Sequence, residues 1–249
     1  MTPVSTTTRH MNLLTSFETG TADVFHRIVF DYAAPYLKEG LSLNVGCWTG
    51  GFENRAVEEG FRLVSVDLEM SALQSAQAVT PGRYLCTKAQ TLPFLDQSFS
   101  AVTFFTVLEH LPENRETEVL VELVRVLKPG GALVLTTPHD HWVGNIADIA
   151  SWLAGHRHYH AQKVENLLRE AGFEIEKVDL KGRLLSNLSI PLFYLCKYLA
   201  RWNIYRNSTV DKWLHQEYAS PGYRDIFLVA RRPSMVAATT NKMQATLTA

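Results

Sequence analysis

The sequence predicts an α/β fold, in which helices cover both faces of a largely parallel sheet. From residue 41 onward, short apolar runs alternate with segments of helical period, which is typical of βαβ units. The first run ends in the glycine-rich stretch NVGCWTGG, residues 44–51, and opens directly into a helical segment. With 249 residues, 46% of them apolar, the chain can bury one large core. We therefore expect a single domain over residues 13–233.

Each element follows from its own pattern. Apolar residues recur at helical spacing between 13 and 40, and Gly40 stops that helix. Further helices are predicted over 50–60, 71–79, 114–131 and 160–173, the third being broken at Pro129-Gly130-Gly131. Strands are predicted over 41–47, 61–68, 83–89, 99–108, 132–138, 174–180 and 223–233.

Three regions fall outside this alternation. Residues 1–12 are predicted to be a flexible start and 234–249 a disordered tail, because neither shows periodicity. An aromatic-rich helical insertion is predicted over 184–216. It is interpreted either as a helical cap packed on the sheet, or as a cover over an apolar or aromatic ligand or a membrane-facing surface.

Charge and cysteine content exclude several classes. Lys and Arg total 24 against 25 Asp and Glu, a net charge of −1, so no general field attracts nucleic acid or an anionic membrane. Three scattered cysteines form neither a disulfide framework nor a C-x-x-C pair. The start of the chain has no signal-peptide pattern, and no apolar run is long enough to span a bilayer. A cytoplasmic location is expected.

A glycine loop and an acidic residue about 20 positions after it indicate a nucleotide-like ligand. Gly46 and Gly50 allow close backbone approach, and Asp67 ends the second predicted strand 21 residues after Gly46. At that distance a carboxylate can accept hydrogen bonds from ribose hydroxyls. The glycine spacing does not match G-x-G-x-x-G, which disfavours a nicotinamide or flavin site. A strand-end turn with a capping Asp is the purely structural alternative.

The segments AQTLPFLDQSFSAVTFFTVLEHLPE and LVRVLKPGGALVLTTP, with the glycine loop before them, resemble the class I S-adenosylmethionine-dependent methyltransferases. The resemblance covers residues 41–138 and, more loosely, 159–180. It implies a Rossmann-like seven-stranded sheet in the order 3-2-1-4-5-7-6 with an antiparallel last strand. It also implies S-adenosylmethionine as cofactor and a small-molecule acceptor. No nucleic-acid partner is expected, because the net charge is near zero.

The resemblance assigns the cofactor site by motif position. It implies that Gly46, Cys47 and Gly50 wrap the methionine part and ribose, Asp67 holds the ribose and Leu68 packs near the adenine. Ala89 and Gln90 would reach the adenine, while Thr106 and Val107 would border the methionine end. Residues 107–110, Val-Leu-Glu-His, are also interpreted as a plain strand-end turn.

Two residues depart from the family pattern. Asn44 stands where the family usually has Asp or Glu, so it offers a hydrogen bond but no full charge to the cofactor's ammonium group. Trp48 stands where the family has Gly, and is compatible with the loop if its φ stays in the ordinary range. These departures keep open a non-catalytic cofactor-binding or regulatory module that retains the fold.

Histidines concentrate beside the predicted site, with six of nine between residues 110 and 160. His110 and His139 each follow a strand end, which favours them as a general base or as groups that orient the acceptor. A base with a pKa near the working pH is needed only if the acceptor keeps its proton. A metal site from His139, His141, His156, His158 and His160 is disfavoured because no carboxylate-histidine motif or cysteine pair accompanies it. Solvated loop histidines are the third interpretation.

Overall fold

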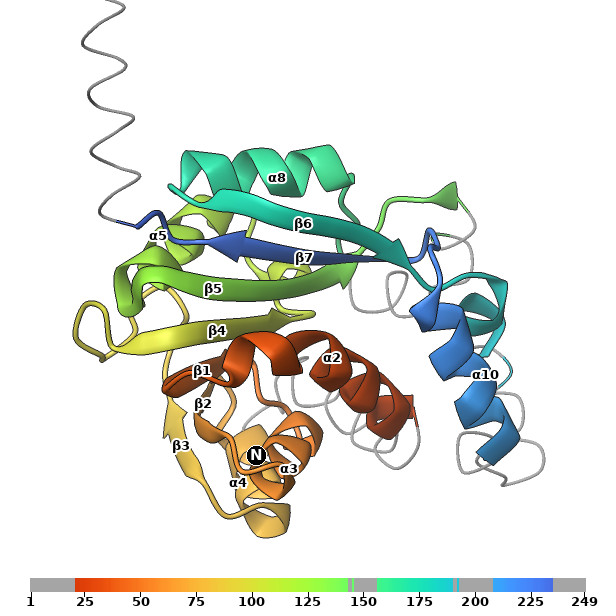
Figure 1. Cartoon of the computed structure of the whole chain (residues 1–249), viewed down its shortest axis with the longest axis horizontal. Helices are drawn as coiled ribbons and strands as arrows, with labels where there is room; N and C mark the ends of the chain where they lie inside the picture. The colour runs from red at the N-terminus through yellow and green to blue at the C-terminus, as the bar shows by residue number, and fades with distance from the viewer. Residues whose placement is uncertain (1–20, 143–144, 146–155, 190–191, 193–207, 235–249) are drawn as a thin grey trace, which may run out of the picture.

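The computed structural model describes residues 21–142, 145, 156–189, 192 and 208–234 (Figure 1). Residues 1–12 and nearly all of the predicted tail lie outside this part of the chain. The strands are β1 (Leu41–Val45), β2 (Arg62–Asp67), β3 (Arg83–Cys86), β4 (Phe99–Phe105), β5 (Leu127–Pro138), β6 (Glu174–Lys181) and β7 (Asp225–Arg231). The helices are α2 (Thr21–Leu37), α3 (Gly51–Glu58), α4 (Met70–Val79), η2 (Leu108–His110), α5 (Glu116–Val126), α8 (Ala161–Glu170) and α10 (Ser208–Ala219).

The seven strands form one sheet in the order β3-β2-β1-β4-β5-β7-β6, as expected. Strands β3, β2, β1, β4 and β5 pair in parallel, so their carboxyl ends share one edge. Strand β7 runs antiparallel to both β5 and β6. The start of β7 therefore lies at the edge where the parallel strands end, which brings residues 223–225 beside the end of β5.

Helices α2, α3 and α10 cover one face of the sheet. Their apolar side chains form a cluster with residues of β4, β5 and β7 that face the same way, such as Phe105, Val134 and Phe227. Helix α4 packs on the outer strands β2 and β3, where Ala76 and Leu73 contact Cys47.

Helices α5 and α8 cover the opposite face; Figure 1 shows α8 above β6 and α5 at the left end of the sheet. Leu120 and Leu123 of α5 and Leu168 of α8 are fully buried there. The central strands alternate between the two clusters: Val102 and Phe104 face α5, whereas Ala101 and Phe105 face α2. This alternation is the period-2 pattern expected of strands buried on both faces.

The boundary between α5 and β5 differs from the prediction. The helix ends at Val126, and β5 begins at Leu127, so Pro129 and Gly130 lie within the strand rather than at a helix break. Leu127 already has extended dihedrals. Lys128 precedes proline, and proline disfavours the helical region for the residue before it, so the helix stops earlier than the apolar period indicates.

The predicted insertion 184–216 is only partly within the described residues. Residues 184–189 are helical. The last described residues of the insertion, 208–216, belong to α10, which continues to Ala219 and packs on α2. Within the part of the chain that the structure describes, no helix is long and apolar enough to cross a membrane.

Candidate active site

The residues that the sequence predicts for a ligand gather at the carboxyl edge of the sheet. The loop 46–50 follows β1, Asp67 ends β2, Thr106 follows β4 and His139 follows β5. Ligands of open α/β sheets bind outside this edge. Sequence order therefore places the candidate site at the expected edge, and the contacts below define its geometry.

The loop after β1 needs glycine at its first position. Gly46 has φ +86°, and a Cβ built there would lie 2.3 Å from Val107 Cγ2, the side chain that follows β4. The Gly46 and Cys47 amides donate to the carbonyl of Val66 at 2.8 and 3.3 Å. Close approach of the loops after β1 and β4 thus leaves no room for a side chain at Gly46. The predicted pair Gly46 and Val107 is brought into contact.

The carboxylate of Asp67 ties two loops together. Its Oδ2 accepts the Trp48 amide at 3.0 Å, and its Oδ1 accepts the Glu69 amide at 3.0 Å. The carboxylate is only partly buried, and two charged oxygens offer about four acceptor positions, so others remain for hydroxyl groups. Beside it, Leu68 is 60% exposed, an apolar side chain left open at the edge.

Two residues of the site adopt left-handed backbone conformations. Trp48 has φ +47°, so the expectation of an ordinary φ is wrong. Thr106 has φ +51°, which is rarer still for a β-branched residue. The amide of Trp48 is held by Asp67 and that of Thr106 by the carbonyl of Thr136 at 2.9 Å. Strain of this kind, about 1–3 kcal/mol each, persists only where neighbours hold the backbone, and it is common at functional sites.

Asn44 lies below the loop and is already engaged. It is 2% exposed, its Nδ2 donates to Glu53 Oε1 at 2.6 Å, and its Oδ1 accepts the Thr103 hydroxyl at 2.7 Å. Glu53, in the first turn of α3, is also 2% exposed. Burial raises the pKa of Glu53, an effect that the Asn44 and Ser65 side chains oppose. Glu53 is not among the residues predicted from the sequence, although an acidic residue directly after the glycine loop is a usable signal.

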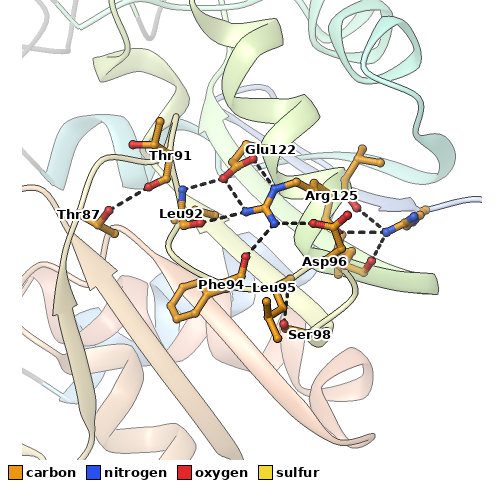
Figure 2. Close-up of polar contacts among 12 residues, drawn as sticks. Thr87, Thr91, Leu92, Phe94, Leu95, Asp96, Ser98, Glu122 and Arg125 are labelled. Carbon is orange, nitrogen blue, oxygen red and sulfur yellow. Dashed lines mark hydrogen bonds and ion pairs between the residues drawn. The ribbon is translucent and has the colours of Figure 1, made fainter.

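The predicted adenine contacts lie on the loop after β3, and Figure 2 shows how Arg125 holds the later part of that loop. Ala89 and Gln90 are half-buried in the turn after β3. Farther along that loop, the Arg125 guanidinium donates to the carbonyls of Leu92 and Phe94 at 2.9 and 2.7 Å and to Asp96 at 2.7 Å. It also forms two bonds of 2.8 Å to the Glu122 carboxylate.

Cys47 is 2% exposed and faces α4 rather than the edge of the sheet. Burial, with a smaller contribution from Glu53, raises the pKa of its thiol. Only the backbone of this predicted residue is therefore placed to line a ligand site.

The turn after β4 is anchored by a second arginine. Arg157 donates to Glu116 at 2.6 Å and to the carbonyls of Leu108 and Leu111 at 3.2 and 2.5 Å. The Tyr159 hydroxyl joins the same network through Glu116 and Leu108 at 3.1 and 3.2 Å. These hydrogen bonds hold the segment 156–160 against η2 and place the His156 ring next to the His110 ring.

His110 and His156 meet edge to face, with ring centroids 4.3 Å apart. His110 is exposed at the protein surface, with the His156 ring against it. Desolvation by the surrounding protein, with a smaller contribution from His156, lowers the pKa of His110 to about 4. His110 is therefore neutral at pH 7 but a weak base, unlike the near-neutral pKa that a general base is expected to have.

His139 has the geometry of a proton acceptor. Its Nδ1 lies 2.9 Å from the carbonyl oxygen of Tyr223, just before β7. A carbonyl only accepts, so the hydrogen lies on Nδ1 and the neutral ring presents Nε2 as an acceptor. The backbone of His139 is bridged to Tyr159, and its amide donates to Arg224 at 2.8 Å. Both favoured histidines thus follow strand ends, but only His139 has a fixed tautomer.

Aromatic rings surround His139. His141 stacks beside it with centroids 6.4 Å apart, and Tyr223 packs on His141 at 4.5 Å. His160 lies edge to face with His139 at 6.3 Å, and its Nε2 is 3.2 Å from Asp140. His158 instead contacts Asn145. Among the described residues, no three of His, Cys, Asp or Glu are grouped as a metal site would require.

A further histidine packs against the start of α3 from α2. A Cβ built at Gly51 would lie 2.0 Å from His26 Nδ1, and that nitrogen is enclosed without a hydrogen-bond partner. Burial lowers the pKa of His26 to about 4. Protonation would place a positive charge in this contact.

We expect the chain to lose stability on mild acidification. In the unfolded chain His26 takes up its proton near pH 6.5, whereas in the folded protein it does so only near pH 4. Between these values the unfolded state binds more protons, so the free energy of unfolding falls as pH falls. Thermal unfolding at pH 7.5 and 5.0 should show a smaller drop in Tm for His26→Gln than for the wild type. An equal drop would contradict the assignment, and His215→Gln on α10 serves as a control.

The order of the sheet, the glycine loop after β1 and the acidic residue that ends β2 define the class I methyltransferase fold. Residues 43–135 match the model of the family described as "Methyltransferase domain". The match extends from β1 to β5 and contains the loop 46–50, Asp67 and Thr106.

Curated relatives match the same region. A demethylmenaquinone methyltransferase of Renibacterium salmoninarum is 33% identical over 94 residues, which cover 37% of this chain and 39% of that protein. A probable S-adenosylmethionine-dependent methyltransferase of Mycolicibacterium smegmatis is 26% identical over 61% of this chain and 58% of its own length. The chain thus spans less than two thirds of these relatives.

Solved structures share the fold at low identity. A SAM-dependent methyltransferase from Archaeoglobus fulgidus has a TM-score of 0.65 at 17% identity and covers 89% of this chain and 99% of its own. The [4+2]-cyclase SpnF has a TM-score of 0.61 at 23% identity, with 86% and 81% covered. These likenesses concern the fold alone, because one of the two structures bears the name of a different reaction.

Proposed function

We propose that this protein is an S-adenosylmethionine-dependent methyltransferase that acts on a small, apolar or lipid-linked acceptor by in-line methyl transfer. The observation that carries the proposal is the junction of the glycine loop with Asp67 at the carboxyl edge of the sheet. The match of residues 43–135 to the methyltransferase domain family supports it.

The residues of the junction fit such a cofactor. Gly46 keeps the loop clear of side chains, Asp67 retains acceptor capacity beyond its two amide bonds, and Leu68 is exposed next to it. Asp67 would bind the ribose hydroxyls, and Leu68 with Ala89 would cover the adenine. Thr106 and Val107 would border the methionine end, where β4 approaches the loop.

When bound, S-adenosylmethionine supplies a methyl group on a positively charged sulfur. The task left to the chain is alignment of the acceptor, which by itself can lower a barrier by several kcal/mol, up to about 7–11 in well-oriented systems. His139 is placed to take the acceptor's proton at Nε2, because the Tyr223 carbonyl fixes its tautomer. His110, with its lowered pKa, is better suited to accept a hydrogen bond than to hold a proton.

We expect His139→Ala to lower kcat about 100-fold for an acceptor that must lose a proton, while leaving the Kd for the cofactor unchanged. His110→Ala should lower kcat less. Steady-state kinetics at saturating cofactor, with calorimetric Kd values for both variants, would test this. Full activity of His139→Ala would remove the support for base catalysis by this group.

The surroundings of His139 favour an apolar or aromatic acceptor. His141 stacks beside it, Tyr223 packs on His141, and Trp142, the residue after His141, is 71% exposed. Leu184, Leu185 and Leu188 are about half exposed where the described part of the insertion begins. Peripheral membrane contact through 184–216 remains part of the proposal for a lipid-linked acceptor, although most of that segment lies outside the described residues.

A non-catalytic cofactor-binding or regulatory module is the second candidate. Asn44 and Trp48 depart from the family pattern, and Trp48 adopts a left-handed backbone conformation with φ +47°. The two candidates differ in turnover: both bind the cofactor, but only an enzyme consumes it.

The experiment that tests the proposal is a search for labelled products. Purified protein and cofactor carrying a deuterated methyl group are added to a small-molecule and lipid extract, and mass spectrometry looks for acceptors heavier by one labelled methyl. The proposal expects such products, absent with a heat-inactivated control. Cofactor binding without any labelled product in aqueous and lipid fractions would favour the non-catalytic module.

A further inference from the structure

Glu53 is a buried acidic group without a positive partner. Its side chain is 2% exposed, and Oε2 is enclosed and makes no well-formed hydrogen bond. Among the described residues, no Lys, Arg or His forms an ion pair with it. An unpaired buried carboxylate costs several kcal/mol, so a position of this kind calls for a reason beyond packing.

The hydrogen bonds around Glu53 set its orientation. Thr103 donates its hydroxyl to Asn44 Oδ1, which fixes the amide so that Asn44 Nδ2 points to Glu53 Oε1. The chain of bonds therefore ends with a donor aimed at the carboxylate. Asn44 acts as the partner that holds Glu53, and its own amide is not available to a ligand in this arrangement.

Glu53 lies directly beneath the loop of the candidate site. It is in the first turn of α3, whose N-cap is Gly50, and there the helix dipole favours a negative charge. The titratable groups that face it are the Asp67 carboxyl, the Cys47 thiol and the Tyr84 phenol, with Ser65 beside it. None of these is a cation, so together they favour positive charge in the loop above.

We propose that Glu53 supplies the negative charge that attracts the cationic end of the ligand held by the loop 46–50, and that Asn44 positions it. The inference rests on the proposed function, since S-adenosylmethionine carries an ammonium and a sulfonium group. Glu53 is enclosed by protein, so it acts on the ligand through its charge and not by contact, and Asn44 is the positioning residue. A protonated, neutral Glu53 with only a structural role is the competing explanation.

A glutamine variant separates the two explanations. Glu53→Gln has nearly the shape of glutamate and is neutral, as a protonated glutamate is, so it removes a charge only if Glu53 is ionised. We expect it to raise the Kd for S-adenosylmethionine about tenfold, the effect of one charge at an intermediate effective dielectric. The Kd for 5′-methylthioadenosine, an uncharged analogue, should stay within twofold. Glu58→Gln, at the exposed end of the same helix, is the matched control and should leave both Kd values unchanged.

A charge-swapped variant keeps the test valid if Glu53→Gln folds poorly. In Asn44→Asp with Glu53→Gln, the new glutamine donates to the new aspartate, so the hydrogen bond and the net charge are both retained. We expect the Kd of this double variant for S-adenosylmethionine to lie within about threefold of the wild-type Kd, which corresponds to about 0.7 kcal/mol. Tm values of all variants show whether a change in Kd reflects folding.

The pH dependence of binding provides an independent measurement. Because burial raises the pKa of Glu53, its charge is lost as pH falls toward and through that raised pKa. In the wild type, the Kd for S-adenosylmethionine should therefore rise on acidification more than that for 5′-methylthioadenosine. In Glu53→Gln the difference between the ligands should disappear.

The outcomes are distinct. If the wild type binds S-adenosylmethionine and Glu53→Gln binds it equally well, Glu53 has only a structural role and the inference is wrong, while the proposed function stands. If both ligands weaken equally in Glu53→Gln, the loss is one of loop structure and the inference is again wrong. If the wild type binds neither ligand, the proposed function fails and the inference fails with it.

Discussion

Replacing Asp67 by alanine should raise the Kd for S-adenosylmethionine at least tenfold, because two sets of hydrogen bonds are lost together. One set is the proposed contact with the ribose hydroxyls. The other is the pair of bonds to the amides of Trp48 and Glu69, each 3.0 Å long. Without its acceptor, the left-handed backbone at Trp48 loses the contact that holds it.

Calorimetric titration measures this effect, and two further variants make it specific. Asp67→Asn retains one acceptor oxygen and should fall between the wild type and Asp67→Ala. Asp31→Ala, on the exposed side of α2, removes a carboxylate far from the loop and should leave the Kd unchanged. An unchanged Kd in Asp67→Ala would place the cofactor elsewhere.

Replacing Arg125 by alanine should lower the free energy of unfolding by about 2–4 kcal/mol, the range for losing several charge-assisted hydrogen bonds at a partly exposed site. Arginine has five N–H donors, and here all five are used, on Leu92, Phe94, Asp96 and twice on Glu122 (Figure 2). Lysine offers three donors from a single nitrogen, so Arg125→Lys should recover only part of the loss.

The loop that Arg125 holds continues from Ala89 and Gln90, so its loosening should also weaken cofactor binding about three- to fivefold, roughly 0.6 to 1 kcal/mol. Arg169→Ala is the matched control, since Arg169 forms one exposed pair with Glu165 at 2.7 Å. Such pairs contribute about 0.3–0.5 kcal/mol. Denaturant unfolding of the wild type, Arg125→Ala, Arg125→Lys and Arg169→Ala measures these differences in the free energy of unfolding. Equal losses in Arg125→Ala and Arg169→Ala would show that the network adds nothing beyond a surface pair.

Much of the fold could be predicted because each strand and helix has its own local pattern of apolar residues. The alternation of apolar runs with helical periods placed every strand, and the loop after β1 and the end of β2 located Gly46 and Asp67 at the site edge. The strand order came from the resemblance and not from periodicity, because pairing depends on long-range contacts. The limit of α5 was misjudged because apolar spacing continued past the residue where proline redirects the chain.

The parts of the site that could not be predicted depend on side chains that meet only in the folded chain. Arg125 and the carbonyls it binds are about 30 residues apart, and Arg157 contacts η2 across more than 40. His26 reaches the start of α3 from a separate helix. The lowered pKa of His110 arises from desolvation and from His156, neither of which a strand-end position reveals.

Titration calorimetry of the purified chain with S-adenosylmethionine tests the central claim most directly. We predict one binding site per chain with a Kd between about 1 µM and 1 mM, the range of ordinary enzyme substrates, and competition by S-adenosylhomocysteine. The loop 46–50 and Asp67 should carry this binding, so the Asp67→Ala protein, if still folded, should show it at least tenfold weakened. No heat of binding at a ligand concentration of about 1 mM in the folded wild type would contradict the claim.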